Sequence, residues 1–291
     1  MATSRKGLER LEALVAHVLL VTACAFAVYP LLWVITLALS PTGPGAEARL
    51  LPIVSAPSLD NFRTVVGWNA APGQNDATWL FAHQLGNSLV VSLATAFVAI
   101  AVATPTAYAL ARFPFVGAKG GLRALLATQM FPTVASAVPL YLLLDALHLL
   151  DSRAGLVLVY ASTAVPFAIF QLRGSFLAIP VDIEEAAMVD GATRARAFFL
   201  VVLPAARPAI AVTALFAFMS AWNEFILAAT LLSRKSAYTL PVVIQSYVQE
   251  QSTSWGPFAA GAILVSVPVM VLFYVAQRQL VSGLTQGGVK G

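Results

Sequence analysis

Long apolar runs, separated by shorter polar connections, dominate the pattern of residues along this chain. A helix crosses the roughly 30 Å of bilayer hydrocarbon with about 20 residues, and six runs have about that length. Strand-like alternation of apolar and polar residues is absent, and a helix satisfies its own backbone hydrogen bonds within lipid. The pattern therefore predicts an all-α polytopic membrane protein with six transmembrane helices. The six runs are Ala13–Leu39, Leu85–Leu110, Leu122–Leu147, Ala154–Leu172, Ala205–Leu232 and Phe258–Leu280.

Composition agrees with a protein that resides in the lipid bilayer. Hydrophobic residues make up 59% of the chain and charged residues only 10%, whereas a soluble domain is about half apolar and a quarter charged. The single cysteine, Cys24, excludes an intramolecular disulfide and a cysteine metal cluster. The 3 histidines are scattered, so we expect no metal site.

The positions of lysine and arginine predict the orientation. With the N-terminus inside, twelve of these residues fall on the cytoplasmic side and five on the external side, which together account for all 17. Cytoplasmic connections carry the excess of positive charge in membrane proteins, so we expect both termini in the cytoplasm. The cations form no dense stripe with interleaved aromatic residues, which argues against nucleic-acid binding.

This orientation divides the chain into segments with different expected roles. Residues 1–39 are an N-terminal cytoplasmic segment and the first span, and residues 40–84 form an external loop that is rich in proline. Residues 85–280 hold the other five spans, with a cytoplasmic loop at residues 174–204. Residues 281–291 form a C-terminal cytoplasmic tail. Prolines within the spans are expected to kink the helices.

Local chemistry predicts two short helices in the cytoplasmic loop. Pro180 ends the preceding segment, Asp182 is the expected N-cap, and Glu185 three residues later completes a capping box. Gly191 breaks the helix through its freedom at positive φ, and a second helix follows over Thr193–Val202. Two interpretations remain open from these residues: an amphipathic connector resting among lipid headgroups, or a contact surface for another protein.

A specific motif in this loop favours the contact surface. Glu185-Ala186-Ala187, three further residues, Gly191, nine further residues and then Val201-Val202-Leu203-Pro204 resemble the EAA signature of importer permeases of the ATP-binding-cassette (ABC) superfamily. The one departure is Val201, where the family usually has isoleucine.

Three further stretches extend the resemblance to the carbohydrate-importing branch, and particularly to its maltose/maltodextrin permeases with six spans. They are QMFP at Gln129–Pro132, EEAAMVDGAT at Glu184–Thr193 and GLTQGGVKG at Gly283–Gly291. The resemblance implies a multi-pass protein of the bacterial or archaeal cytoplasmic (inner) membrane. Its implied cargo is a di- or oligosaccharide, either maltose or maltodextrin or a related sugar such as trehalose.

The same resemblance implies several partners besides the lipid bilayer: a second permease subunit, a homodimeric ABC ATPase and an external sugar-binding protein. The chain has no G-x-x-x-x-G-K-[ST] phosphate loop. We therefore expect a transport subunit that is not an enzyme and binds no cofactor, with ATP and Mg used by the partner ATPase. The residues that the resemblance assigns to ATPase coupling are Glu185, Ala186, Ala187, Gly191, Arg194, Arg196, Leu203 and Pro204.

The glycine-rich C-terminus is a second candidate contact. From the residues alone, Gly287, Gly288, Lys290 and Gly291 would form a frayed end. Similarity to the maltose/maltodextrin permeases implies instead that the tail reaches into the interface between the two ATPase subunits.

An acidic residue in the fifth span is the candidate for the substrate pathway. Glu224 lies in Trp222-Asn223-Glu224-Phe225, and an intramembrane charge is a functional-site hypothesis by default. Its carboxylate would contact sugar or line a gate, or else would bond Asn223 or another helix and hold the bundle together. Glu224 also motivates an alternative function, a proton- or sodium-coupled secondary carrier. A membrane enzyme ranks lowest, because no catalytic constellation is evident.

Overall fold

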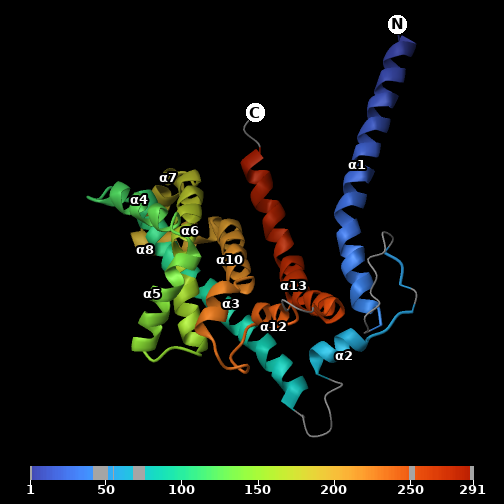
Figure 1. Cartoon of the computed structure of the whole chain (residues 1–291). Helices are drawn as coiled ribbons and strands as arrows, with labels where there is room; N and C mark the ends of the chain where they lie inside the picture. Colours follow the sequence, from blue (N-terminus) through green and yellow to red (C-terminus); the bar gives the residue numbers. More distant parts are fainter. Residues whose placement is uncertain (1, 42–51, 55, 68–75, 249–252, 289–291) are drawn as a thin grey trace. The chain divides into compact units, whose positions relative to one another are not determined.

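Helices make up almost all of the regular structure in this chain. The computed structural model describes residues 2–41, 52–54, 56–67, 76–248 and 253–288 (Figure 1). Within these ranges there is no strand longer than the isolated bridge between Val248 and Thr253, so the expected all-α class is confirmed. The chain divides into two compact units, Met1–Thr78 with Ile244–Ser266 and Trp79–Val243 with Val267–Gly291, and each is described by itself.

The helices are joined by segments of different lengths, the longest of which is residues 40–59. In chain order they are α1 (Ala2–Leu39), α2 (Asp60–Val66), α3 (Asp76–Arg112), α4 (Ala118–Thr128), α5 (Thr133–Ala146), α6 (Arg153–Ala178), α7 (Val181–Val189), α8 (Arg194–Ala197), the π-helix η1 (Phe198–Val202), α9 (Leu203–Ala205), α10 (Arg207–Trp222), α11 (Ile226–Leu231), α12 (Leu240–Gln245) and α13 (Trp255–Gly288).

Among the residues that the structure describes, four helices are each long and apolar enough to cross a membrane. They contain the segments Leu11–Leu39, Leu80–Arg112, Arg153–Ala178 and Trp255–Gln277. Two bent pairs of helices pass the same test, which gives six spans if each pair counts as one. Pro30, Pro105, Pro139, Pro166 and Pro268 all lie inside helices that remain continuous.

The third expected span, Leu122–Leu147, is not one helix. It is divided into α4 and α5, which meet at an angle of 98°. Pro132 is the N-cap of α5 with ψ of 128°, and its ring removes the N–H that would continue α4. The Gln129 side chain pins this elbow by donating to the carbonyl of Thr163 in α6 at 2.9 Å.

The fifth expected span, Ala205–Leu232, is also interrupted. Its start is bent by 73° between the α8–α9 segment and α10. Helix α10 ends at Trp222, and α11 begins only at Ile226. The break therefore falls on the acidic residue that the sequence singles out.

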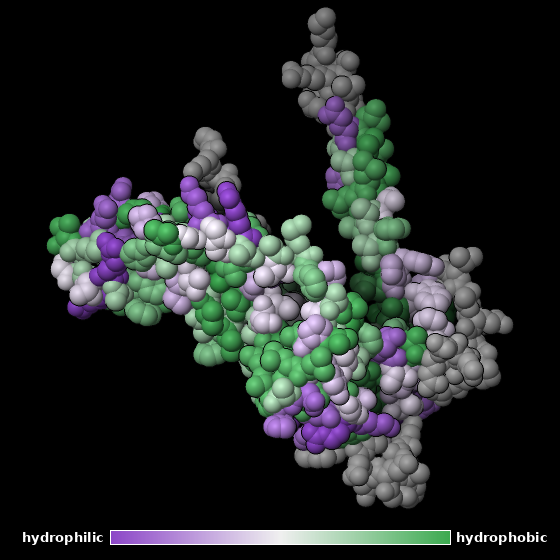
Figure 2. Space-filling model, turned by 60° about the vertical axis from the view of Figure 1, so that its left-hand side comes forward, coloured by the Kyte–Doolittle hydropathy of each residue, from purple (hydrophilic) through white to green (hydrophobic). Residues whose placement is uncertain are grey.

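Exposed apolar side chains cover the surface of α1. Phe26 is 82% exposed, and Leu19 and Leu31 are more than half exposed. Figure 2 shows this helix as a column of mostly hydrophobic surface. Soluble monomers rarely expose such a continuous apolar surface, so α1 suits a bilayer.

In the unit that contains α1, one buried amide joins two helices. The Asn61 side chain of α2 donates to the carbonyls of Leu37, Ala38 and Ser40 at 3.3, 3.1 and 2.7 Å, which serves the unpaired C-terminal carbonyls of α1. A Cβ on Gly256 would lie 2.5 Å from the Asn61 Oδ1 atom, so a larger residue here would displace the Asn61 amide. Helix α2 and the start of α3 lie within residues 40–84, the segment expected to be the external loop.

Two buried clusters form the core of the second unit. One, the inner cluster, gathers small residues of α3 with large residues of α6 and η1, whereas the other gathers residues of α5, α6 and α11. The inner cluster is Ala103, Ala107, Tyr108, Ala168, Ile169, Leu172, Phe176, Phe198, Val202 and Ala206. The other, the outer cluster, is Val91, Ala137, Leu144, Leu156, Val159, Tyr160, Ala221, Leu227, Ala228, Leu231, Leu232 and Val242.

Candidate functional site

The loop that carries the sequence motif folds into α7 and a second helical segment. Helix α7 begins two residues earlier than expected: Pro180 is its N-cap, and no side chain caps it. Asp182 is thus wrong as the N-cap and lies in the first turn, where the helix dipole still favours its charge. Thr193 does cap α8, and its Oγ1 accepts from the backbone N–H of Arg196 at 3.3 Å.

Two adjacent glutamates of α7 have opposite environments. Glu185 is exposed, whereas Glu184 is 4% exposed. The Tyr108 hydroxyl donates to Glu184 Oε1, and the Arg112 Nε donates to Glu184 Oε2 at 3.1 Å. Arg112 also donates from Nη2 to the carbonyl of Ile179 at 2.9 Å. We call Tyr108, Arg112 and Glu184 the inner latch, because they fasten α7 to the end of α3.

Aromatic rings surround the inner latch. The Tyr108 ring centroid lies 5.8 Å from that of Phe113, 5.9 Å from Phe176 and 4.5 Å from Phe198. The guanidinium carbon of Arg194 lies 5.1 Å from the Phe113 centroid, a cation–π distance. Arg194 is thus engaged within the chain.

Gly191 makes the turn between the two helical segments. Its φ is +89°, in the left-handed region that glycine enters without steric cost. The N–H of Ala192 donates to the carbonyl of Ala187 and the N–H of Gly191 to that of Met188, both at 3.0 Å, as in a Schellman helix end. A Cβ at Gly191 would have nothing within 4 Å. Glycine is therefore favoured here by the positive φ of the backbone, and not by a lack of room for a side chain.

The residues expected to couple to an ATPase differ in their exposure. Glu185, Ala186, Gly191 and Arg196 are exposed, Ala187 is half-buried, and Val189 is 87% exposed. Among the residues that the structure describes, the Arg196 guanidinium has no partner. Leu203 and Pro204 are half-buried, and Leu203 packs against the inner cluster. We call residues 181–197 the docking segment.

The C-terminal contact lies largely beyond what the structure describes. Helix α13 continues to Gly288, so Gly287 and Gly288 are its last residues. Lys290 and Gly291 lie outside the described residues.

Glu224 occupies the break between α10 and α11. Its carboxylate accepts from the Tyr160 hydroxyl at 2.8 Å and from the backbone N–H groups of Leu227 and Ala228 at 2.8 and 3.0 Å. Two orphan donors at the start of α11 are thereby satisfied. These contacts favour the structural interpretation of Glu224, with Tyr160 of α6 rather than Asn223 as the partner.

The neighbours of Glu224 do not line one surface. Trp222 is 1% exposed, and its ring stacks on Phe218 with centroids 5.4 Å apart. Phe225 packs against the outer cluster. Asn223 is exposed and donates to the carbonyl of Met219 at 3.0 Å. Of the four expected pathway residues, only Asn223 presents its side chain openly to a passing solute.

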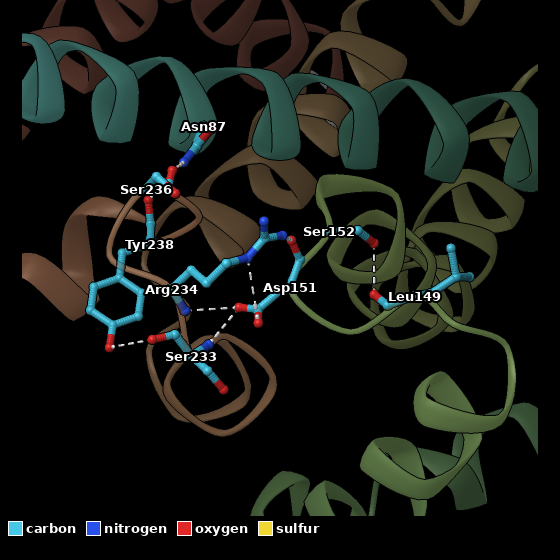
Figure 3. A network of polar contacts seen from close by, with 8 residues as sticks. All are labelled: Asn87, Leu149, Asp151, Ser152, Ser233, Arg234, Ser236 and Tyr238. Carbon is cyan, nitrogen blue, oxygen red and sulfur yellow. Dashed lines mark hydrogen bonds and ion pairs between the residues drawn. The ribbon is translucent and has the colours of Figure 1, made fainter.

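A polar network lies beside the first half of α3, on the side of the membrane that the sequence predicts to be external (Figure 3). Asp151 Oδ1 accepts from the backbone N–H groups of Ser233 and Arg234 at 2.6 and 3.0 Å. The Arg234 Nε atom lies 3.7 Å from Asp151 Oδ2. The φ of Asp151 is 53°, which places this residue in a tight turn. Its carboxylate bonds this turn to the segment after α11.

Side chains of α3 hold the rest of that segment. Gln84 donates to the carbonyl of Lys235 at 2.9 Å, and Asn87 donates to those of Ser236 and Tyr238 at 2.8 and 3.0 Å. The N–H of Leu240 donates to Ser88 Oγ at 2.7 Å. In addition, the Asn87 amide oxygen accepts from Arg153 Nε at 2.8 Å. We call Gln84, Asn87 and Ser88 the outer anchors and residues 233–240 the outer loop.

Acidification is expected to loosen the outer loop. Burial alone raises the pKa of the Asp151 carboxyl, but the N–H groups of Arg234 and Ser233 and the Arg234 charge hold it below its usual value. The folded state therefore binds this proton only at lower pH than the unfolded state. Its stabilisation is complete above about pH 4 and is lost as pH falls below that value.

Thermal unfolding of the wild type and Asp151→Asn, measured across pH, checks this expectation. The wild type should unfold at the higher temperature near neutral pH, and the gap should close as pH falls below about 4. A gap that widens on acidification would contradict the assignment.

A small hollow lies beside the outer anchors. It has a volume of about 180 Å³ and is lined by Ala82, His83, Gly86, Val90 and Arg153. Pockets that enclose small-molecule ligands have about 300–1,000 Å³, so this hollow does not hold a disaccharide.

Several residues of these networks escape sequence reasoning. From the sequence, Arg112 is only one of the cations that predict the orientation, and Glu184 is only one residue of the EEAAMVDGAT motif. A signal for Glu184 does exist, because it lies three and four residues before Ala187 and Met188, which are both half-buried, and such residues share a helix face. Tyr108 and Tyr160 carry no comparable signal, since a tyrosine in an apolar run resembles ordinary core.

Comparisons with known proteins agree on one family. The family described as "Binding-protein-dependent transport system inner membrane component" matches residues 99–286. The trehalose transport system permease protein SugB of Mycobacterium tuberculosis is 36% identical over 268 residues, covering 91% of this chain and 93% of SugB. The maltose/maltodextrin transport system permease protein MalG of Yersinia pestis is 36% identical over 305 residues, covering 100% and 98%.

A solved structure has the same fold. It is a bacterial ABC transporter involved in the import of the acidic polysaccharide alginate, and one of its chains matches with a TM-score of 0.73. The match is 24% identical and covers 92% of this chain and 96% of that chain.

Proposed function

Because this chain belongs to the family of binding-protein-dependent transport system inner membrane components, we propose that it moves a di- or oligosaccharide into the cell as part of an ATP-driven importer. Members of this family are transport components, so the chain is a membrane-embedded transport subunit and not an enzyme. The sugar cargo is supported by two relatives, one named for trehalose and one for maltose and maltodextrin, each 36% identical to this chain.

The docking segment is the single observation that carries the proposed coupling to ATP. It exposes Glu185, Ala186, Val189 and Arg196, while the inner latch and the Arg194–Phe113 contact hold it against the bundle. A separate homodimeric ABC ATPase would bind ATP and Mg and would seat this segment. Arg196, whose guanidinium is uncommitted, would pair with an acidic residue of the ATPase.

Transport would follow alternating access with further partners. A second permease would complete the sugar path, in keeping with the small hollow and the buried Trp222 of this chain. An external binding protein would deliver the sugar. ATP binding would close the ATPase dimer, the docking segment would follow, and the spans would rock from inward-facing to outward-facing.

A carrier that works alone through Glu224 has little support. The Glu224 carboxylate accepts hydrogen bonds from Tyr160, Leu227 and Ala228 of the same chain. A proton or sodium carrier instead needs a carboxylate that binds and releases the ion. Glu224 is therefore assigned to the support of the α10–α11 break.

Uptake into proteoliposomes tests the cargo. The purified complex, with its binding protein, is supplied with ATP and offered maltose, a maltodextrin, trehalose or inorganic phosphate. ATP-dependent accumulation of at least one of the sugars, with no accumulation of phosphate, is expected. Accumulation of phosphate alone would overturn the proposed cargo.

A further inference from the structure

Helix α3 is fastened by polar side chains at two levels, one at Ser88, twelve residues after the helix begins at Asp76, and one at Tyr108, near its last residue Arg112. We refer to these two levels as the outer and inner ends of α3. Ser88 of the outer anchors bonds the outer loop, and Tyr108 of the inner latch bonds the docking segment. Tyr108 follows Ser88 by 20 residues, a separation of roughly 30 Å along a helix, which is about the thickness of bilayer hydrocarbon. The two sets of polar contacts therefore lie where α3 would leave the membrane on either side.

Between its fastened ends, α3 is unbroken and closely packed. It is one helix from Asp76 to Arg112. Ala99, Ala103 and Ala107 are each 0% exposed and recur every four residues, which allows neighbouring helices to approach closely. Pro105 lies within this stretch and donates no backbone hydrogen bond, but the helix continues through it, so a displacement at one end of α3 reaches the other.

The inner latch is built to prevent slippage between α7 and α3. Its two donors on α3 are four residues apart and so lie on one helix face, and each donates to a different oxygen of Glu184. The Arg112 and Glu184 side chains are 7% and 5% exposed. If α7 slid along α3, both charges would remain buried without partners, which is strongly unfavourable.

We propose that α3 transmits displacement of the docking segment to the outer loop, with Tyr108, Arg112 and Glu184 as positioning residues at its inner end and Gln84, Asn87 and Ser88 at its outer end. This inference rests on the proposed function, since an ATPase must move the docking segment. Through α3, nucleotide binding by the ATPase would change the position of the outer loop, on the side of the permease that is predicted to be external. The contacts of α3 with the outer loop and with the docking segment form a continuous physical connection, of the kind that can carry coupling between distant sites.

The outer loop offers a direct readout of this coupling. Cys24 is the single cysteine, so Cys24→Ser gives a cysteine-free chain, into which Lys235→Cys introduces one exposed thiol in the outer loop. In the reconstituted complex, a membrane-impermeant maleimide then measures how fast this thiol reacts with and without ATP. Nucleotide should change the rate at least threefold.

Variants at the two ends of α3 test the route. Tyr108→Phe and Glu184→Gln at the inner end, and Ser88→Ala at the outer end, should each reduce the nucleotide-dependent change in labelling rate at least fivefold. The ATP hydrolysed per sugar imported should rise at least threefold, because hydrolysis continues without its mechanical consequence. The matched control, Tyr141→Phe, loses the same hydroxyl at an exposed position of α5 and should change neither quantity.

The outcomes separate this inference from the proposed function. An unchanged labelling response in Tyr108→Phe and Ser88→Ala, in a complex that imports sugar with ATP, would overturn the role of α3 alone. Failure of the background complex to import any sugar with ATP would overturn the proposed function instead. If Glu184→Gln does not fold, Tyr108→Phe still decides, because it removes one hydroxyl and keeps the Arg112–Glu184 pair.

Discussion

Replacing Glu184 with alanine is expected to lower the free energy of unfolding of this permease by about 3–5 kcal/mol, whereas the same change at the adjacent Glu185 is expected to leave it nearly unchanged. Loss of the Glu184 carboxylate leaves the Arg112 guanidinium, 7% exposed, without its buried counter-ion. It also removes the acceptor of the Tyr108 hydroxyl. Thermal unfolding of the purified protein in detergent measures the effect.

The change at Glu185 is expected to affect binding of the ATPase instead of the stability of the permease. Glu185→Ala should reduce recovery of the ATPase with the permease in detergent, because Glu185 is exposed on the docking segment. Glu184→Leu provides a second comparison, since an apolar side chain of similar volume fills the site but still leaves Arg112 unpaired. If Glu184→Ala and Glu185→Ala unfold at the same temperature, the inner latch does not stabilise the fold.

Replacing Gly191 with valine is expected to abolish most of the sugar uptake while the protein remains inserted in the membrane. A β-branched residue at φ of +89° is strained by about 1–2 kcal/mol or more. The chain will relieve this strain by changing the angle between α7 and α8, which misplaces the docking segment. We expect ATP-dependent uptake to fall about tenfold or more, as a shift of about 1.4 kcal/mol in seating the ATPase is a factor of ten.

Two controls isolate the backbone effect. Gly191→Asn should retain most uptake, because asparagine tolerates the left-handed region. Gly174→Val places the same side chain on α6, where a Cβ also has nothing within 4 Å and φ is not positive, and should reduce uptake little. Equal loss of uptake in Gly191→Val and Gly174→Val would show that conformation at Gly191 is not the cause.

The helical architecture follows from the sequence because lipid leaves the backbone few alternatives. Each apolar run of about 20 residues has to form a helix, and the family model and the fold bear out this class. The breaks are harder to place. Pro132 ends a helix, yet Pro105 and Pro166 lie within continuous helices, because neighbouring groups in each environment decide whether a lost hydrogen bond is replaced.

The candidate site is only partly predictable, since its key contacts join residues far apart in the chain. Gly191 is predictable, because a positive φ is a local requirement. The Tyr108–Glu184 and Tyr160–Glu224 bonds span 76 and 64 residues, and no local pattern shows which glutamate faces inward. For the same reason the sequence leaves Glu224 open between a pathway role and a structural one, and only the structure shows its carboxylate bonded to the start of α11.

ATP, hydrolysed by a partner bound at the docking segment, is expected to drive sugar through this permease. Proteoliposomes holding the complete complex and its binding protein, and others holding this chain alone, are compared with ATP and with an imposed proton or sodium gradient. Sugar should accumulate only in the complete complex and only with ATP. Accumulation by this chain alone, driven by an ion gradient without ATP, would contradict it.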